Sequence, residues 1–381
     1  MVKGPIWWRV LIAAGLLFAS SAGLLSGCTP VPPVKIGFVG TMMGRCAELT
    51  LDARDGVMLA IEQQNDVGGI NGRPVELLVY DDQQDPQIAL EVNRKLVSSG
   101  VAVVINHSYS TINVKILNEI NRLGILSLSP VAGATALAGH DDYFFMMHGT
   151  LGPAVSSLVR ETTSKNLKKA SVIYDLSNQI YTQEWFAEFK RLYEQNGGEV
   201  VKTITYYSRA ALNLSSLALQ LLDSDADLVL AIGNSYDTAI LFQQIRNRNR
   251  MLALYTTELA MTNDFLEYGG PAVEGVTLAG IFDPYSSNVG FVGFKKDYYH
   301  RFNTEPSGAA VLAFETARLF MEVLTKSHAT TTVQVKKAIL EQRVFQGLQG
   351  PYSINRFGDA RRDVTLSTVR DRNFRRCNDA K

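Results

Sequence analysis

The sequence predicts an α/β fold of two successive doubly wound lobes, and three observations support this prediction. Short, continuously apolar segments of strand length alternate with amphipathic helical segments, which is typical of a parallel sheet covered by helices on both faces. The same alternation restarts after Gly149 and Thr150. Once an N-terminal leader is set aside, about 350 residues remain, too many for one ordinary core and enough for two lobes.

The first 27 residues have the features of a cleaved export signal peptide. Lys3 and Arg9 form a short positive segment, and the uncharged run Val10–Leu25 is shorter than the ~20 residues that cross a bilayer. Leu25-Ser26-Gly27-Cys28 resembles a bacterial lipobox, in which Cys28 would become the lipidated first residue of the mature chain. Residues 28–33 are rich in proline and predict an extended tether. The alternative is an uncleaved anchor helix that ends in cysteine by chance.

In the first lobe, four apolar segments are predicted as strands: Val34–Gly40, Val75–Tyr80, Val101–Asn106 and Ile125–Ser129. Three intervening segments predict helices, namely Asp52–Asn65, Pro86–Ser99, and a helix that Ser110 or Thr111 caps and that runs through Arg122. Asp81, Asp82 and Asp85 are better explained as helix-capping or solvated acids than as a cation site, because Pro86 suits the first turn of a helix.

The second lobe repeats this pattern. Its predicted strands are Ala170–Tyr174, Val200–Tyr207, Leu228–Ile232 and Leu252–Thr256. Its predicted helices are Gln183–Asn196, Leu214–Leu222 and Thr238–Asn247. Ligands bind beyond the carboxyl ends of the strands in open parallel sheets. If the two lobes face each other, one cleft is therefore lined by the loops Thr41–Leu49, His107–Thr111, Pro130–Thr135, Asp175–Tyr181, Gly233–Asp237 and Thr257–Met261.

Charge and cysteine content exclude several classes of function. The chain has 37 basic and 37 acidic residues, and no basic block precedes Arg370–Arg376, so no nucleic-acid partner is predicted. Cys46 and Cys377 could pair in an exported protein, but the sequence does not show that they meet. No metal-ligand cluster and no cofactor motif is present, and residues 377–381 are predicted to be a tail.

Polar residues in the strand-end loops predict a site for a zwitterion. Ser108, Ser110 and Thr111 open a helix, where hydroxyls and free N–H groups favour an anion, although plain helix capping explains them equally well. In the small-residue loop that contains Val131 and Gly133, the backbone can approach a ligand closely. Glu258 follows a strand and could receive an ammonium group, the alternative being a solvated loop acid.

The sequence does not predict an enzyme. It contains no Gly-x-Ser-x-Gly elbow, no phosphate-binding loop, no Gly-x-Gly-x-x-Gly after a strand and no His-Glu-x-x-His. The five histidines are scattered, and His107 is better explained as a loop or packing residue than as a base.

An ordered set of motifs resembles the leucine/isoleucine/valine-binding family of type I periplasmic binding proteins, the receptors of branched-chain amino-acid ABC transporters. The resemblance covers essentially all of the mature chain, and its motifs are Val34-Lys35-Ile36-Gly37, Gly68-Gly69-Ile70-Asn71-Gly72-Arg73, Val79-Tyr80-Asp81-Asp82-Gln83-Gln84-Asp85-Pro86, His107-Ser108-Tyr109-Ser110-Thr111, Ser127-Leu128-Ser129-Pro130, Glu274-Gly275-Val276 and Gly347-Leu348-Gln349-Gly350-Pro351. It implies two Rossmann-like lobes with three hinge crossovers, residues 34–149 and 282–347 forming the first lobe and residues 150–281 and 348–376 the second.

The same resemblance implies how a ligand would be held. Ser108, Ser110 and Thr111 would bind the carboxylate together with the backbone of Val131 to Gly133, and the Val131 carbonyl and Glu258 would bind the ammonium. Tyr181 would close over the ligand from the second lobe. Further second-lobe residues would face the cleft, namely Asn178, Asn234, Ser235 and Tyr236.

Departures from the family pattern leave the preferred side chain open. Gly133 stands where threonine is frequent, and His148 stands where arginine is usual. Arg45 and Cys46 occupy the first loop, where Arg45 could reach a second acidic group on the ligand.

We therefore expect an exported, lipid-anchored subunit at the cell membrane or its periplasmic face. It would capture a small amino-acid-like solute by hinge closure and deliver it to an ABC permease, without a cofactor. The alternative is a sensor subunit that binds an amide, urea or an aromatic acid for a signalling partner.

Overall fold

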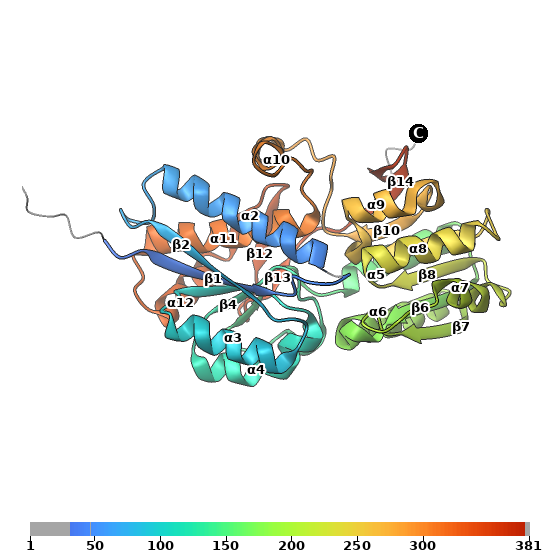
Figure 1. The fold of residues 1–381 in the computed structure, drawn as a ribbon, viewed down its shortest axis with the longest axis horizontal. Coiled ribbons are helices and arrows are strands. Elements are labelled where there is room, and N and C mark those ends of the chain that lie inside the picture. Colours follow the sequence, from blue (N-terminus) through green and yellow to red (C-terminus); the bar gives the residue numbers. More distant parts are fainter. Residues whose placement is uncertain (1–30, 46, 378–381) are drawn as a thin grey trace, which may run out of the picture.

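The computed structural model describes residues 31–45 and 47–377, which form two α/β lobes lying end to end (Figure 1). The predicted signal peptide, Cys28 and Cys46 lie outside these residues. Cys377 lies near the C-terminus with an intermediate exposure and a free thiol. Within the described part of the chain, no helix is long and apolar enough to cross a membrane.

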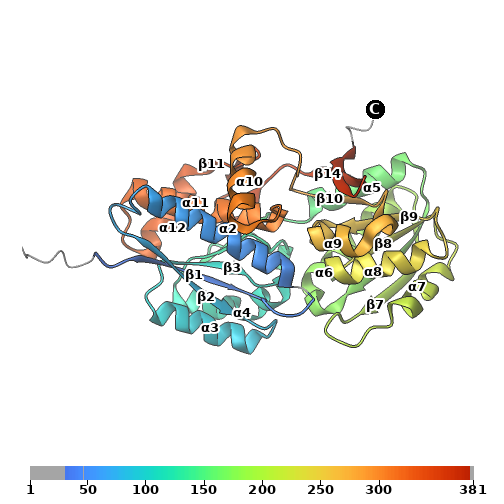
Figure 2. The ribbon, with the colours of Figure 1, turned by 45° about the horizontal axis from the view of Figure 1, so that its top comes forward.

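The first lobe is built on a five-stranded parallel sheet. Its strand order is β2 (Val75–Asp81), β1 (Val34–Gly40), β3 (Val103–His107), β4 (Ser127–Ser129) and β5 (Phe144–Met146). One face carries α3 (Pro86–Ser98) and α4 (Ser110–Leu123), and the other carries α2 (Ala47–Asp66) and α11 (Gly308–Ser327) (Figure 2). Buried apolar side chains from both helix layers enclose the strands, as expected for a continuously apolar parallel sheet.

Helices α2 and α11 pack unusually closely because a glycine lies at their contact. A Cβ atom on Gly56 of α2 would come within 2.2 Å of the Ala310 carbonyl oxygen of α11. Any larger residue at this position would therefore separate the two helices that cover this face of the sheet.

The second lobe contains a seven-stranded sheet in which the first five strands along the chain run parallel. Its order is β15 (Asn373–Arg376), β14 (Thr365–Arg370), β10 (Thr277–Gly280), β9 (Ala253–Thr257), β8 (Leu228–Ile232), β6 (Lys169–Asp175) and β7 (Glu199–Tyr206). The two last strands, β14 and β15, pair antiparallel. The covering helices are α5 (Gly152–Ser164), α6 (Gln179–Gln195), α7 (Leu214–Leu222), α8 (Ser235–Arg246) and α9 (Asn263–Gly269). The two successive doubly wound units confirm the predicted fold class.

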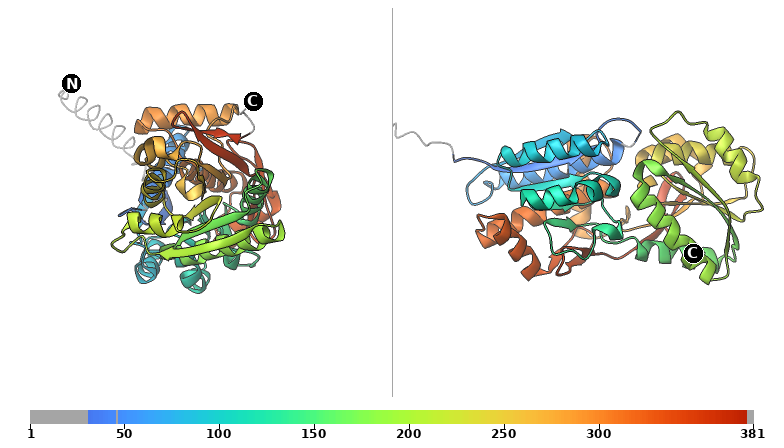
Figure 3. Two further views of the ribbon diagram at one scale, coloured as in Figure 1. Left: turned by 90° about the vertical axis from the view of Figure 1, so that its right-hand side faces the viewer. Right: turned by 90° about the horizontal axis from the view of Figure 1, so that it is seen from below.

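The chain crosses between the lobes three times, at 147–151, 281–288 and 362–364. After the second crossing, α10 (Val289–Phe302), α11 and α12 (Thr332–Gln342) return to the first lobe, as the orange helices of Figures 1 and 3 show.

The sequence places the third crossing too early, at residue 348. Strands β12 (Pro351–Ile354) and β13 (Ala360–Arg361) form a small antiparallel sheet with β11 (Val344–Gln346), so residues 348–361 remain with the first lobe. The Arg362 guanidinium then pairs with Glu315 of α11 at 2.6 Å, and the chain reaches the second lobe only at β14.

Several predicted helix starts also need correction. Helices α6 and α8 begin at Gln179 and Ser235, four and three residues before their predicted starts. Helix α2 begins at Ala47, five residues before the predicted start, so that Glu48 and Leu49 belong to its first turn. Helix α4 begins after Tyr109, whose side chain makes no cap, so the predicted capping by Ser110 or Thr111 is wrong. By contrast, Asp85 caps α3 by accepting hydrogen bonds from the backbone N–H groups of Gln87 and Ile88, which confirms the capping interpretation of this acid.

Candidate functional site

The carboxyl ends of both parallel sheets face the space between the lobes, and two adjoining cavities lie there. The first encloses about 390 Å³ and the second about 510 Å³, counting space that is open to solvent. Leu49 and Leu259 line both cavities, so one continuous interlobe region contains them.

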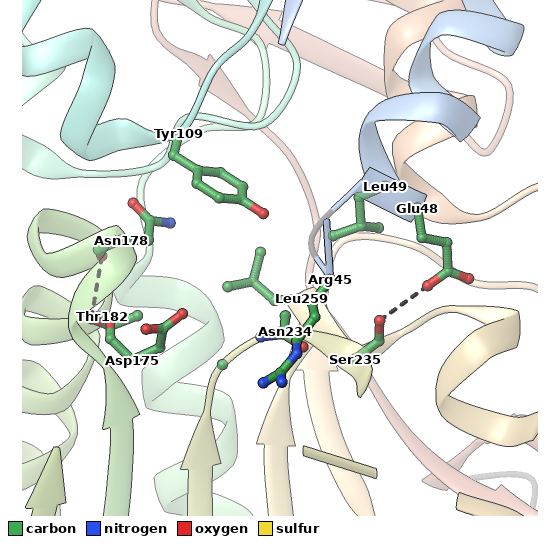
Figure 4. Close-up of a pocket in the computed structure, with 11 residues that line it drawn as sticks. Arg45, Glu48, Leu49, Tyr109, Asp175, Asn178, Thr182, Asn234, Ser235 and Leu259 are labelled. Carbon is green, nitrogen blue, oxygen red and sulfur yellow. Dashed lines mark hydrogen bonds between the residues drawn. The ribbon is translucent and has the colours of Figure 1, made fainter. Parts of the chain in front are cut away.

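Most residues that line the first cavity have polar side chains. Arg45, Glu48 and Tyr109 line it from the first lobe, and Figure 4 shows their side chains converging on residues of the second lobe. The second-lobe lining residues with polar side chains are Asp175, Asn178, Thr182, Asn234 and Ser235.

Hydrogen bonds across the first cavity hold the two lobes together. The Arg45 guanidinium donates to Asp237 at 3.0 Å, and the Ser235 hydroxyl donates to Glu48 at 3.0 Å. The Thr111 hydroxyl donates to the Asn178 side-chain oxygen at 3.2 Å and accepts from the Ile180 N–H at 2.9 Å. The structure therefore represents a closed arrangement of the lobes.

Contacts outside the cavities extend this closure. The Thr135 backbone N–H donates to the Glu184 carboxylate at 2.8 Å. In addition, Arg209 donates to the Gln84 carbonyl oxygen at 3.0 Å.

Glu48 is the most perturbed acid of the first cavity. One carboxylate oxygen accepts from Ser235 and the other from the backbone N–H of Asp264, at 3.0 Å each. Burial raises its pKa to about 7, because desolvation of the charged form outweighs the hydrogen bond from the Asp264 backbone. Asp264 and Asp52 lie close enough to raise this pKa further by charge repulsion.

The second cavity has mainly apolar walls and one carboxylate. Its apolar lining side chains include Leu49, Met261, Ile281, Phe282 and Leu312. The polar side chains that line it are His107, His148, Tyr181 and Glu258. Such walls, with a few polar groups at defined points, are typical of small-molecule sites.

Glu258 is held by two neighbours and keeps one oxygen unpaired. The Tyr181 hydroxyl donates to Glu258 Oε1 at 2.5 Å, and His148 Nε2 lies 3.6 Å from the same oxygen. Burial, followed by the charge of Glu258, raises the pKa of the Tyr181 hydroxyl well above its usual value, so that this group remains a donor. Glu258 Oε2 is buried and has no partner among the described residues, so it is available to a cationic group.

The predicted site residues divide into three groups. Those lining the first cavity are Arg45, Asn178, Asn234 and Ser235. Those lining the second are Val131, Tyr181 and Glu258. Those lining neither cavity are Ser108, Ser110, Thr111, Gly133 and Tyr236.

Most of the residues outside the cavities are engaged by neighbouring residues, but the buried Ser108 Oγ has no hydrogen-bond partner among the described residues. Ser108 and Ser110 are buried, and the Tyr236 ring packs edge-on against Tyr268 at 5.0 Å between centroids. Gly133 is packed so closely that a Cβ atom there would lie 2.8 Å from the Leu151 side chain. Val131 and Glu258 thus share a cavity, whereas the predicted carboxylate-binding hydroxyls do not line it, and the binding roles of all these residues remain predictions.

Several lining residues were not singled out from the sequence. Glu48, Leu49 and Leu259 lie in predicted strand-end loops, but nothing in their residue types distinguished them from packing residues. Ile281 and Leu312 come from a crossover and from α11, which the strand-end rule does not cover.

The site offers acids, amides and imidazoles but no metal-binding cluster. Within residues 31–45 and 47–377, no group of three or more His, Cys, Asp or Glu side chains is arranged to hold a metal ion. The arrangement can bind a small polar molecule with an apolar body by hydrogen bonds and charge.

Comparison with known proteins agrees with this geometry. The family model described as periplasmic binding protein matches residues 33–373. The Leu-, Ile-, Val-, Thr- and Ala-binding protein of Pseudomonas aeruginosa is 24% identical over 352 residues, 90% of this chain and 92% of the relative. Leu/Ile/Val-binding protein homolog 1 of Brucella suis is 22% identical over 363 residues, 94% of each chain.

Solved structures share the fold. A leucine binding protein from Thermotoga maritima superposes with a TM-score of 0.82 at 18% identity, covering 90% of this chain and 97% of the other. A solute binding protein of an ABC transporter from R. palustris, in complex with benzoate, also gives 0.82, at 19% identity and with 91% and 95% covered.

Proposed function

The chain belongs to the periplasmic binding protein family, and from this premise we propose that it is the substrate-binding component of an ABC transporter. It captures a small amino acid or amino-acid-like solute between its lobes and delivers it to a permease. It acts by binding and release, and not as an enzyme.

The observation that carries this proposal is the buried, unpartnered Oε2 of Glu258 in an interlobe cavity. A buried carboxylate oxygen without a donor is unfavourable, and a ligand ammonium group would satisfy it by a charge-assisted hydrogen bond. Val131, whose carbonyl oxygen is a second candidate acceptor for the ammonium, lines the same cavity.

Hinge closure explains how ligand binding is coupled to recognition of the protein by a permease. The lobes are joined by three short crossovers and meet through bonds such as Arg45 to Asp237. A ligand that contacts both lobes stabilises this closed form over an open one, because it gains its second set of contacts only on closure. A permease that recognises the closed shape would then receive mainly loaded protein.

The relatives support an amino acid as the ligand. The name of the Pseudomonas protein describes binding of leucine, isoleucine, valine, threonine and alanine, and that of the Brucella protein describes a homologue of a Leu/Ile/Val-binding protein. An aromatic acid such as the benzoate of the R. palustris complex is the competing ligand class, since the second cavity is largely apolar. Benzoate has no positive group to pair with the Glu258 carboxylate, and the two negative charges would repel each other. This repulsion disfavours the alternative.

Titration calorimetry on purified, ligand-stripped protein tests the proposal with the standard amino acids and benzoate as probes. We expect an amino acid to bind best, and Glu258→Ala to weaken it at least about a hundredfold, as when one partner of a buried charge pair is removed. Glu194→Ala, which removes an exposed acid of the same lobe, should leave the affinity unchanged. Tight benzoate binding, or an affinity that Glu258→Ala does not alter, would refute the amino-acid assignment.

We also propose that Cys28 carries the lipid anchor. The Leu25–Cys28 motif and the proline-rich tether after it support this, and both lie outside or at the margin of the described residues. In a bacterial host fed radiolabelled palmitate, the full-length chain should incorporate label and sediment with membranes. Cys28→Ser should lose both properties; a variant that stayed labelled would disprove the anchor.

A further inference from the structure

His107 holds a fixed position in the wall of the second cavity. It ends β3, lines the cavity, and has only 1% of its surface exposed. Its Nδ1 lies 3.2 Å from the Thr50 hydroxyl oxygen, and its ring stacks on Phe38 with centroids 6.3 Å apart. On the neighbouring strand, Gly40 leaves room for it, since a Cβ there would lie 3.1 Å from the His107 Cβ.

The other ring nitrogen is unused. His107 Nε2 is buried and has no hydrogen-bond partner in the part of the chain that the structure describes. Burial lowers the pKa of the ring to about 3, so the imidazole is neutral at physiological pH. With Nδ1 engaged by Thr50, either tautomer leaves Nε2 as an unpaired donor or acceptor, which is unfavourable until a ligand supplies the partner.

The rest of the cavity wall shows what this partner would be. Tyr181 and His148 already face Glu258, and most other lining side chains are apolar. Among the polar side chains that line the cavity, the buried unpaired atoms are therefore His107 Nε2 and Glu258 Oε2. If Glu258 receives the ammonium, His107 is left for a second polar atom of the ligand, and a neutral ring suits a neutral group.

We propose that His107 determines side-chain preference by hydrogen-bonding a neutral polar group of the ligand, so that hydroxyl and amide side chains are bound more tightly than hydrocarbon side chains of the same shape. This inference rests on the proposed function, since it takes the second cavity as the amino-acid site.

Isosteric ligand pairs test the proposal directly. Threonine and valine differ by a hydroxyl in place of a methyl group, and asparagine and leucine by an amide in place of an isopropyl group. In calorimetry on the ligand-stripped mature protein, threonine should bind about tenfold more tightly than valine, because a site with an unpaired polar group discriminates against the analogue that lacks the partner. Asparagine should likewise exceed leucine.

Substitutions at His107 separate this role from mere packing. His107→Leu should invert the threonine-to-valine ratio while valine affinity stays equal or rises, and His107→Gln should retain part of the preference. His140→Leu, which changes an exposed histidine, should leave the ratio unchanged. Equal threonine and valine binding by the wild type, or a ratio that His107→Leu leaves intact, overturns the role of His107 alone. If no amino acid binds to the wild type, this role and the proposed function fall together.

Discussion

The two interlobe cavities differ in how completely their polar atoms are paired. In the first, the charged and amide side chains bond one another across the lobes, and no buried side-chain polar atom among its described lining residues lacks a partner. In the second, His107 Nε2 and Glu258 Oε2 are buried within mainly apolar walls and have no partner in the part of the chain that the structure covers. Polar atoms that are already paired contribute little free energy to ligand binding, whereas buried unpaired atoms contribute much when a ligand supplies the missing partner.

This difference indicates that the two cavities have different roles. The bonds around the first cavity stabilise the closed arrangement of the lobes, and under our proposal the second cavity distinguishes between ligands. Variants in the first should therefore shift the affinity for all ligands together, whereas variants in the second should change affinity and preference.

Filling the second cavity should have the largest effect. Ala309 lines this cavity from α11, and a phenylalanine there would occupy the space in which we place the ligand. Ala309→Phe should reduce the affinity for the best amino acid at least about a hundredfold, since overpacking costs 1–3 kcal/mol in addition to the lost contacts. Calorimetry measures the loss, and a melting curve checks that the fold is intact.

The matched control changes an exposed position. Ala211→Phe lies in a loop of the second lobe and should bind as the wild type does. Unaltered binding by Ala309→Phe would place the ligand elsewhere, most simply in the first cavity.

Removing the Arg45–Asp237 ion pair should have a smaller effect on affinity, and the effect should be the same for all ligands. Arg45 bonds the buried Asp237 across the lobes, and burial raises the pKa of that carboxyl, partly offset by Asn234 and Arg45. Arg45→Ala should weaken every ligand about tenfold, because removing one partner of a charged hydrogen bond costs roughly 1–3 kcal/mol. The order of affinities across the amino-acid panel should stay the same.

Arg54→Ala provides the comparison for Arg45. Among the described residues, Arg54 forms its ion pair with Asp55 on the same helix, so its removal should not alter closure. A changed order of preference in Arg45→Ala would mean that this side chain contacts the ligand, as the sequence interpretation of Arg45 allowed.

The fold was largely predictable from the sequence because the spacing of apolar residues in a segment indicates both its secondary structure and its buried face. The strands Val34–Gly40 and Leu228–Ile232 lie where the apolar runs predicted them. The third crossover was misplaced because the short strands β12 and β13 carry no long apolar run, and only their pairing with β11 assigns them to the first lobe.

The candidate site was less predictable because cavities depend on which side chains meet across the lobes. Glu258 and Val131 follow strands whose ends meet, so the strand-end rule found them. Thr111 satisfied the same rule, yet its hydroxyl is used to hold Asn178 and Ile180. A hydroxyl at a helix start does not reveal whether its partner will be a ligand or the other lobe.

A change of pH should have the smallest effect on closure, and this effect should arise mainly from Glu48 in the first cavity. In the closed form burial raises the pKa of Glu48 to about 7, whereas opening would expose it and return the pKa toward its ordinary value of 4.5. The closed form then binds a proton more tightly. Closure is therefore most favourable below pH 4.5, weakens as the pH rises from there through about 7, and is constant above that.

Small-angle scattering on ligand-free protein measures this without any titration of a ligand. Between pH of about 5 and about 8 the open-to-closed ratio should rise by up to about tenfold, less than the full shift implies because Glu48 is partly exposed. Glu48→Gln should flatten the dependence, with a remainder from Asp264 and Asp237, whose pKa values burial also raises. Asp52 lies on α2 with Glu48, and its hydrogen bond to Ser307 stays within the first lobe, so it should contribute little to opening. A Glu194→Gln control should keep the wild-type profile, and a Glu48→Gln profile as steep as that of the wild type would assign the dependence to another group.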